Sequence, residues 1–378
     1  MRLLISAGEA SGEMYGAQLI DALRRRVPGL ECFGVGGERM QAVGCELIAQ
    51  SKDLAVVGIT EILPRLPKIY GEFRKLIRAI DDRKPQGAIL IDSPAFHFKV
   101  ARELHRRAIP VIYYVAPQLW AWRSGRVRLV RRYFKKALVI FPFEEQWYRD
   151  RGVDAEFVGH PLADVEESSE PLEEFVEAQG YESDKPIIVL MPGSRHKEIC
   201  MNLPAMLRAA EILGCDYQFV LPIAPTIDRW WLDLLVQKIN PSYNFILFTT
   251  TDTRALAHAR AAVVASGTAT VEAAMMGTPM VVVYRVSPLT WALGRPLVHV
   301  KNFAMVNLIA GEQVVSELIQ RDFTAENVAA RLREILPDGA VREKMERDLA
   351  QVRARLKSRD GAGTAAERAA DAVLRALA

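Results

Sequence analysis

The sequence predicts an α/β protein built from two Rossmann-like, doubly wound domains that face a central cleft. The chain has 378 residues, which is more than one domain of ordinary size contains. Short runs of Val, Ile and Leu alternate with amphipathic stretches of helical period, as in buried parallel strands joined by helices. The alternation restarts after residues 159–175, an acidic stretch with two prolines, which indicates a domain on each side.

The apolar runs assign most of the chain to elements. In the first domain, residues 1–164, strands are expected at 3–7, 32–35, 55–58, 87–92, 111–116, 138–142 and 156–158. In the second domain, residues 165–354, strands are expected within 187–194, 218–224, 245–250, 261–266 and 280–284. Helical patterns fill most of the gaps and continue from about residue 323 to the end. The last helix, about 355–378, is expected to pack on the first domain or to be exchanged in a dimer.

Composition and charge narrow the classes of partner. Half of the residues are apolar and a quarter are charged, which is the balance of a soluble globular protein. Residues 1–160 contain 26 Lys and Arg against 18 Asp and Glu, whereas the rest of the chain is net acidic. A basic first half suits an anionic partner, namely a phosphorylated ligand, a nucleic acid or an anionic membrane.

Other classes are disfavoured by what the sequence lacks. The four cysteines match no metal-ligand spacing, and no cluster of His, Asp and Glu does so, and we therefore expect no tightly held metal and no cofactor. The apolar run after Arg2 stops at Glu9, so no signal peptide is expected. No apolar run reaches the roughly 20 residues that span a bilayer. We therefore expect a reduced protein on the cytosolic side that is soluble or lies on a membrane surface.

The first candidate ligand site follows the expected strand within 187–194. Gly193 allows the backbone to approach a ligand closely, Ser194 can cap the following helix, and Arg195 lies in its first turn. A helix N-terminus with an arginine is a favourable diphosphate site, and ligands of parallel sheets bind at the carboxyl ends of the strands. An ordinary capped turn explains the same residues.

The second candidate site follows the expected strand 261–266. Ser266, Gly267 and Thr268 offer hydroxyl and backbone N–H groups at a helix start. Glu272 lies four residues past Thr268 and so shares its helix face, where it can accept hydrogen bonds from two ribose hydroxyls. This turn alone is also explained as an ordinary cap, but two such turns on neighbouring strands favour a diphosphate site.

Two carboxylates are expected at the corresponding edge of the first domain. Asp92 ends the expected strand 87–92, and Glu9 follows the expected strand 3–7. The turn that holds Glu9 is rich in glycine like a phosphate loop, but Glu9 and Glu13 would repel a phosphate. Two carboxylates here suit the binding and deprotonation of a hydroxyl, with Asp92 as a general base. Capping of the next helix explains Asp92 equally well.

A basic stretch follows in the first domain. Residues 113–136 hold seven basic residues and no acidic one, and Arg123 and Arg126 are the candidates for binding a phosphate on an acceptor. A solvated basic helix face is an equal alternative. Trp120 and Trp122 cluster in one loop and do not interleave along a sheet, which argues against nucleic acid.

A second basic stretch carries apolar residues. Residues 58–80 place apolar side chains beside arginines and lysines, which suits the interface of an anionic membrane. A core-facing amphipathic helix is the plainer alternative. The membrane-facing candidates are Ile62, Leu63, Leu66 and Ile69.

Six motifs in a fixed order are more specific than any of these turns. They are AGEASGE, IDSPAF, YVAPQLWAW, PGSR, ASGTATVE and NLIAGEQVVSELIQ, which lie between residues 7 and 320. In these motifs the chain resembles the lipid-A-disaccharide synthase family. The resemblance implies a GT-B glycosyltransferase of lipid A biosynthesis, which binds its nucleotide sugar on the C-terminal domain and its acceptor on the N-terminal one.

The resemblance also implies substrates and a location. The family joins UDP-2,3-diacylglucosamine to 2,3-diacylglucosamine 1-phosphate (lipid X), inverts the anomeric configuration and releases UDP. Its members are peripheral enzymes on the cytosolic side of the inner membrane in the synthesis of lipopolysaccharide, and they suggest a homodimer formed through the C-terminal region.

Site residues carry over by position. Asp92 matches the family's candidate base and Glu9 a second residue of the catalytic centre. Arg195 and Glu272 match the UDP site, and Asn307 matches a residue that lines the cleft on the donor side. No pattern in the sequence other than the resemblance points to Asn307.

Three positions depart from the family pattern, and other functions stay open. Glu13 stands where the family usually has Asp, and Ala95 and His97 stand where it usually has Asp and Asn. Alternatives are a UDP-GlcNAc 2-epimerase, another GT-B enzyme that uses a UDP-sugar, and a non-enzymatic protein that binds UDP or lipid. Asp92 and Glu9 argue against the last, because binding alone needs no base.

Overall fold

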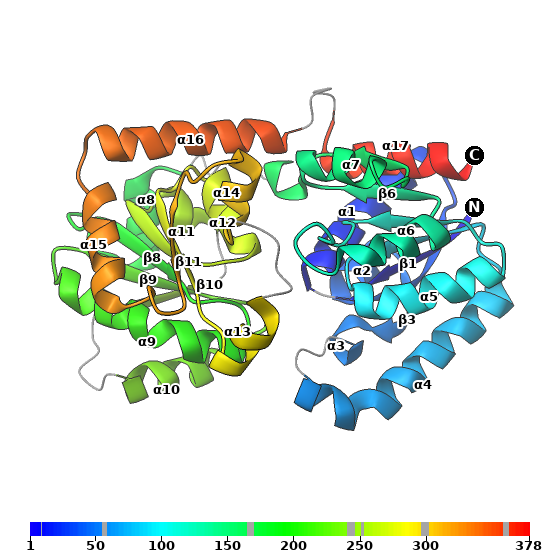
Figure 1. Ribbon diagram of the computed structural model, residues 1–378, viewed down its shortest axis with the longest axis horizontal. Coiled ribbons are helices and arrows are strands. Elements are labelled where there is room, and N and C mark those ends of the chain that lie inside the picture. Colours follow the sequence, from blue (N-terminus) through cyan, green and yellow to red (C-terminus); the bar gives the residue numbers. More distant parts are fainter. Residues whose placement is uncertain are drawn as a thin grey trace. The chain divides into compact units, whose positions relative to one another are not determined.

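The computed structural model describes residues 1–8, 10–54, 59–164, 170–239, 246–250, 253–295, 302–357 and 363–378. They form two compact units, here called unit 1 and unit 2 (Figure 1). Unit 1 comprises Met1–Asp164 and Leu356–Ala378, and unit 2 comprises Val165–Arg355. Each unit is built on one parallel sheet, which confirms the predicted α/β class.

The sheet of unit 1 has seven strands in the order β3-β2-β1-β4-β5-β6-β7, and every neighbouring pair is parallel. The order changes direction between β1 and β4, which makes this pair the switch point of the sheet. The strands are β1 Arg2–Ala7, β2 Glu31–Gly36, β3 Glu46–Gln50, β4 Gly87–Ile91, β5 Val111–Tyr114, β6 Lys136–Val139 and β7 Ala155–Phe157.

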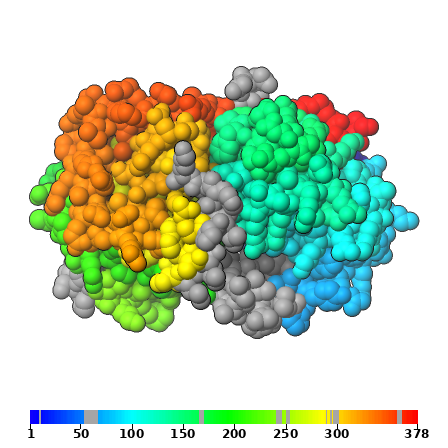
Figure 2. Space-filling view, viewed as in Figure 1, coloured from blue at the N-terminus to red at the C-terminus, as the bar shows by residue number. Residues whose placement is uncertain are grey.

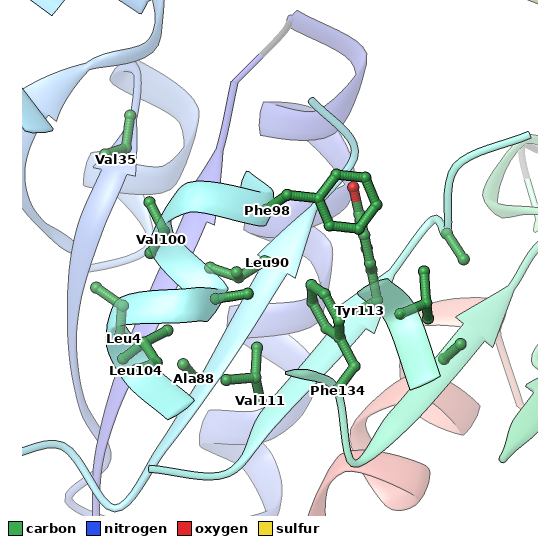
Figure 3. Close-up of a cluster of buried hydrophobic side chains, with 14 of the residues drawn as sticks. Leu4, Val35, Ala88, Leu90, Phe98, Val100, Leu104, Val111, Tyr113 and Phe134 are labelled. Atoms are coloured by element: carbon green, nitrogen blue, oxygen red, sulfur yellow. The ribbon is translucent and has the colours of Figure 1, made fainter. Parts of the chain in front are cut away.

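Helices cover both faces of this sheet, so its central strands are apolar on both sides. Every residue of β4 is buried, as is every residue of β5. Figure 3 shows one face, where Phe98 and Leu104 lie over β4 and β5. The rings of Tyr113 and Phe134 stack there with centroids 4.6 Å apart. Burial on two faces produces the continuous apolar runs seen in the sequence.

The helices of unit 1 connect consecutive strands, apart from the last one. They are α1 Ala10–Arg26, α2 Glu38–Ala42, α3 Ser51–Leu54, α4 Ile59–Arg83, α5 Pro94–Arg106, α6 Val127–Tyr133, α7 Pro142–Arg149 and α17 Ala365–Leu377, with short 3₁₀ turns η1 Ser124–Arg126 and η2 Pro161–Asp164. The last helix, α17, packs beside α1 of the same chain (Figure 1).

Capping and charge fix α17 in place. Thr364 and Glu367 form a capping box at its start. Asp164 Oδ2 accepts a hydrogen bond from the backbone N–H of Ala365 at 2.6 Å, and Arg26 of α1 pairs with Asp371. The small alanines on its inner face allow α17 to lie close to α1 and the sheet.

The sheet of unit 2 has six parallel strands in the order β10-β9-β8-β11-β12-β13, and its switch point lies between β8 and β11. The strands are β8 Ile187–Met191, β9 Gln218–Ile223, β10 Ile246–Thr250, β11 Ala261–Ala265, β12 Met280–Tyr284 and β13 Ser316–Ile319. The helices are α8 Leu172–Gln179, α9 His196–Leu213, α10 Arg229–Ile239, α11 Thr253–Ala257, α12 Thr268–Met275, α13 Pro288–Gly294, α14 Met305–Ala310, α15 Ala325–Ile335 and α16 Ala340–Leu356. Figure 2 shows α15 and α16, in orange, on the surface.

The strand predictions hold for the central strands and fail at one edge of each sheet. The edge strands β3 and β13 were not predicted. Both are short and partly exposed, and each carries a glutamate, so neither gives a continuous apolar run. The strand predicted at 55–58 lies outside the described residues.

Candidate active site

The switch point of unit 1 brings the loops after β1 and β4 together. Asp92 directly follows β4, and Gly8 directly follows β1. A Cβ atom on Gly8 would lie 2.0 Å from Ser93 Oγ, so the two loops are in close contact. The switch point is the edge at which open α/β sheets bind ligands. Glu9, the second predicted carboxylate, lies outside the described residues.

The backbone at Asp92 is strained. Asp92 and Ser93 have φ values of 53° and 45°, in the left-handed region that residues other than glycine rarely adopt. Such a residue costs on the order of 1–3 kcal/mol, so neighbouring groups must hold it. The Asp92 carbonyl oxygen lies 2.7 Å from Nδ1 of His97 and accepts a hydrogen bond from the Tyr113 hydroxyl at 3.0 Å. Neither partner was predicted from the sequence.

Glu13, the other carboxylate of the first loop, has a local partner. It lies in the first turn of α1, and its Oε1 accepts a hydrogen bond from the backbone N–H of Arg39 at 2.9 Å. The carboxylate also lies against Gly37, where a Cβ atom would be 2.3 Å from Glu13 Oε2. Glu13 therefore caps the start of α2, which explains a carboxylate in this loop without a ligand.

The loop after β5 starts at the same edge of the sheet as Asp92, because β5 pairs with β4. Its Trp120 donates a hydrogen bond from Nε1 to Glu144 Oε1 of α7 at 2.8 Å. Arg123 is exposed, and its guanidinium lies 4.6 Å from the centre of the Trp122 ring. Partial burial, with a contribution from Arg123, lowers the pKa of Arg126. Both predicted phosphate-binding arginines thus lie on one anchored loop.

The switch point of unit 2 carries the predicted PGSR turn between β8 and α9. Gly193 has a φ of 126°, and a Cβ atom there would lie 2.4 Å from the Glu198 carboxylate. That carboxylate accepts the backbone N–H of Ser194 at 3.2 Å. Burial raises the pKa of Glu198, although the backbone N–H groups of Ser194 and Arg195 and the charge of Arg195 favour the charged form. The anion-binding N–H groups of this turn therefore already hold an anion from the chain itself.

The second predicted turn lies beside the first, because β11 pairs with β8. Gly267 is the N-cap of α12 and provides no side-chain cap, and Thr268 is exposed. Glu272 lies on the same helix, and burial raises the pKa of its carboxyl. Among the described residues, no group donates a hydrogen bond to this carboxylate. A half-buried carboxylate to which no described group donates suits a ligand that brings hydroxyl groups.

A hydrogen-bonded network that was not predicted supports the second turn. Ser266 Oγ donates to the carbonyl of Phe303 at 2.7 Å. Glu317 of β13 accepts the backbone N–H groups of Phe303 and Ala304 at 2.8 and 3.0 Å. A carboxylate on an edge strand thereby fixes the segment to which Ser266 is bonded. Glu317 was noted only as a member of a motif.

Asn307 occupies the centre of this network. It is fully buried, and its Nδ2 donates to Glu317 Oε1 at 2.7 Å and to the Val315 carbonyl at 3.0 Å. Its Oδ1 accepts the backbone N–H groups of Val314 and Val315. All hydrogen-bonding capacity of the side chain is used inside unit 2, so Asn307 supports the segment to which Ser266 is bonded. Its predicted place in the UDP site stays a prediction.

The membrane candidates are described in part. Ile69 is half-buried on α4, and the side chains of Ile62, Leu63 and Leu66 lie outside the described residues. The neighbouring Tyr70 is 61% exposed. Among the described helices, none combines the length and apolar composition that a membrane crossing requires. Within the same residues, no three His, Cys, Asp or Glu side chains form a group that could hold a metal ion.

Glu144 gives a pH-dependent test of the loop after β5. Burial raises the pKa of Glu144 from 4.5 to about 7, although Trp120 and the N–H groups of Phe141 and Ile140 favour the charged form. The folded state therefore binds this proton more tightly than the unfolded chain, so the stabilisation is complete below about pH 4.5 and is lost as the pH rises through about 7. We expect Glu144→Gln, which cannot ionise, to gain on the order of 3 kcal/mol relative to the parent chain over this range.

Denaturant unfolding of both proteins across this pH range measures the difference. Glu145→Gln is the matched control, because Glu145 is the next residue of α7 and has its own partner in Arg149. A gain of the same size in the control, or parallel pH profiles for Glu144→Gln and the parent chain, would contradict the assignment.

Solved structures show the fold to which the two units belong. The chain resembles CalG4, the calicheamicin glycosyltransferase, with a TM-score of 0.62 and 18% identity over 100% of this chain and 98% of that one. It also resembles the UDP-GlcNAc 2-epimerase from Neisseria meningitidis bound to UDP-GlcNAc, with a TM-score of 0.66 and 12% identity over 100% and 99% of the two chains. Two parallel-sheet units of this kind form the GT-B fold of glycosyltransferases.

Sequence relatives narrow the class to one family. The profile of the family described as lipid-A-disaccharide synthetase matches residues 3–373. The lipid-A-disaccharide synthase of Koribacter versatilis is 53% identical over 99% of this chain and 98% of its own length. The lipid-A-disaccharide synthase of Myxococcus xanthus is 43% identical over 100% of this chain and 97% of its own length. The chain therefore belongs to the lipid-A-disaccharide synthase family, whose members are glycosyltransferases of lipid A synthesis.

Proposed function

We propose that this chain joins UDP-2,3-diacylglucosamine to 2,3-diacylglucosamine 1-phosphate, giving a β-1,6-linked disaccharide 1-phosphate and UDP. The observation that carries the proposal is that the candidate site residues lie at the switch points of both sheets in a chain of this family. Asp92, on a strained turn, lies at the switch point of unit 1, and the two turns that we propose to hold the diphosphate lie at the switch point of unit 2. The chain that carries them belongs to the lipid-A-disaccharide synthase family.

Asp92 is the general base in this proposal. It removes the proton of the acceptor 6-hydroxyl while that oxygen forms a bond to the anomeric carbon of the donor. The bond from that carbon to UDP breaks in the same step, so the configuration inverts and UDP leaves with the electron pair. A positioned base of this kind contributes about 10²–10⁴-fold to the rate. Glu9, the second carboxylate that the sequence places in the catalytic centre, assists in binding the acceptor sugar in this proposal.

Unit 2 holds the leaving group in this proposal. Arg195 and the helix starts at Gly193–Ser194 and Ser266–Thr268 stabilise the negative charge that develops on the diphosphate. A diphosphate on the first turn takes the place of the Glu198 carboxylate. Burial raises the pKa of Glu198 and so disfavours its charged form at this position, which makes it easier to displace. Glu272 accepts hydrogen bonds from the ribose hydroxyls, a role supported by its half-buried position and by the absence of a donor among the described residues.

Arg123 and Arg126 receive the 1-phosphate of the acceptor in this proposal. Their loop begins at the edge that carries Asp92, and the Trp120 hydrogen bond to Glu144 anchors it. The lowered pKa of Arg126 reflects partial burial, which an incoming phosphate dianion would offset.

We also propose that α4 contacts an anionic lipid surface at the cytosolic face of the inner membrane. Tyr70 is exposed, and the Arg74 guanidinium lies 5.9 Å from its ring centre. We expect Arg74→Ser to weaken binding to phosphatidylglycerol vesicles about fivefold, because one basic residue near such a surface contributes about 1 kcal/mol. Tyr70→Ser should weaken it further, since an aromatic ring suits the lipid interface.

Vesicle co-sedimentation measures both effects. Trp230→Ser is the matched control, because Trp230 is a 71% exposed aromatic residue on α10 of unit 2. Equal binding of the parent chain to neutral and anionic vesicles, or an equal effect of the control, would contradict the proposal.

A homodimer formed through the C-terminal region is a further proposal. The region contains α17, which packs on α1 within one chain and could pack on α1 of a second chain in the same way. Sedimentation velocity of the full chain tests it, and a monomer at all concentrations would contradict it.

Mass spectrometry of an end-point reaction tests the main proposal. The purified chain, both substrates and detergent micelles are mixed, with an Asp92→Asn reaction alongside. We expect tetraacyl disaccharide 1-phosphate and UDP from the parent chain, and formation of both about 10²–10⁴-fold more slowly by the variant. Release of UDP without formation of disaccharide would contradict the proposed acceptor. Conversion of UDP-GlcNAc to its 2-epimer in a parallel reaction would favour an epimerase.

A further inference from the structure

We infer that His97 is a positioning residue for Asp92, acting as a neutral imidazole that holds the Asp92 carbonyl group and with it the left-handed backbone of the base. The inference rests on the proposed role of Asp92. His97 lies in the first turn of α5, and its side chain is fully buried. It joins β1 to the loop after β4, because Nε2 lies 2.9 Å from Ser6 Oγ and Nδ1 lies 2.7 Å from the Asp92 carbonyl oxygen.

The two contacts fix the tautomer of His97. A backbone carbonyl oxygen can only accept, so Nδ1 must carry the hydrogen at 2.7 Å. Ser6 can donate or accept, and a neutral ring with its hydrogen on Nδ1 leaves Nε2 as an acceptor for the Ser6 hydroxyl. Burial lowers the pKa of His97 to about 4, which keeps the ring neutral at physiological pH. A positive charge beside Asp92 would lower the pKa of its carboxyl and make it a weaker base. The neutral ring of His97 adds no such charge.

The backbone at Asp92 needs this support. Asp92 and Ser93 are both left-handed, and Ser93 is the N-cap of α5 without a side-chain cap. The Ser93 carbonyl accepts the N–H groups of Phe96 and His97 at 3.1 and 3.0 Å, so the start of α5 holds one side of the turn. The imidazole and the Tyr113 hydroxyl hold the other side through the Asp92 carbonyl. Loss of these donors lets the strained turn relax and moves the carboxylate.

Three variants separate the roles. His97→Leu removes the donor from a site of similar volume, His97→Asn keeps an N–H donor of nearly the same reach, and Tyr113→Phe removes the second donor alone. We expect His97→Leu to lower kcat about 10²-fold with little change in either KM, since a misplacement of a reacting group by about 1 Å has this effect. His97→Asn should restore kcat to within a few-fold of the parent chain, and Tyr113→Phe should show an intermediate loss.

The outcomes distinguish this inference from the proposed function. If Asp92→Asn is fully active, the base assignment fails. If Asp92→Asn is inactive but His97→Leu folds and keeps its kcat, only the positioning role fails. A fall in thermal stability of His97→Leu and His97→Asn alike, with equal kcat values, indicates a purely structural histidine and also overturns it.

Nitrogen NMR of the chain labelled in histidine gives a readout without turnover. Two-bond proton–nitrogen correlations should show His97 as the Nδ1–H tautomer, with no protonation until the pH approaches about 4. An Nε2–H tautomer or an imidazolium ion at neutral pH would overturn the inference. If His97→Leu does not fold, this spectrum and the kcat of Tyr113→Phe still test the positioning role of His97.

Discussion

Asp92→Asn should lower kcat by about 10²–10⁴-fold and leave UDP binding unchanged, because the amide cannot take the proton of the acceptor hydroxyl. The substitution keeps the size of the side chain. It also keeps the carbonyl that accepts from His97 and Tyr113, so the left-handed turn should remain in place. Initial rates of UDP release and calorimetric titration with UDP measure the two quantities.

Asp82→Asn is the matched control for this variant. Asp82 is an exposed residue at the end of α4, before β4 begins. It therefore lies near the amino end of β4, whereas Asp92 follows the carboxyl end of this strand. It should keep the kcat of the parent chain. An Asp92→Asn enzyme within a few-fold of the parent rate would contradict the base assignment, and an equal loss in UDP affinity would place Asp92 in binding.

Arg195→Met should lower kcat by about 10²–10³-fold, which corresponds to about 3–4 kcal/mol, the typical contribution of one preorganised donor to a developing charge. The residue precedes α9 as its N-cap and is exposed, so the change leaves the core of unit 2 intact. UDP affinity should fall as well, but by less than kcat, because the leaving diphosphate carries more charge in the transition state than the bound donor does.

Arg208→Met is the control for this change. Arg208 lies on the same helix and is exposed, and it is about three turns beyond the first residue of the helix. The loss in kcat, measured with saturating donor, should be absent there. An Arg195→Met enzyme that loses only affinity would show that the arginine binds donor and transition state equally.

The sequence predicted the parts of the fold that burial controls. β4 and β5 are buried on both faces and therefore appear as uninterrupted apolar runs. The edge strands β3 and β13 have one exposed side and include Glu46 and Glu317, so the same criterion missed them. Recognition of an edge strand depends on which strand it pairs with, and that information is spread over the chain.

In the candidate site, too, some residues were predicted from the sequence and others were not. The positions of Asp92 and of both turns of unit 2 at the carboxyl ends of neighbouring strands were predicted, because parallel strands place their ends together. Their roles in binding and catalysis stay predictions. His97, Glu198 and Glu317 were not predicted in their present roles, because each acts through backbone groups that have no signature in residue type. A histidine between Phe96 and Phe98 is the one signal that could have raised the question, since a polar ring in an apolar setting needs partners.

The anomeric configuration of the product tests the central claim most directly. Asp92 as a base implies a single displacement at the donor carbon, so the α-linked UDP-sugar must give a β-linked disaccharide. Proton NMR of the purified product, through the coupling between the first two ring protons of the new residue, reports this configuration. We expect the large coupling of a β-1,6 linkage. An α linkage would contradict the claim, because it requires two displacements and a different role for Asp92.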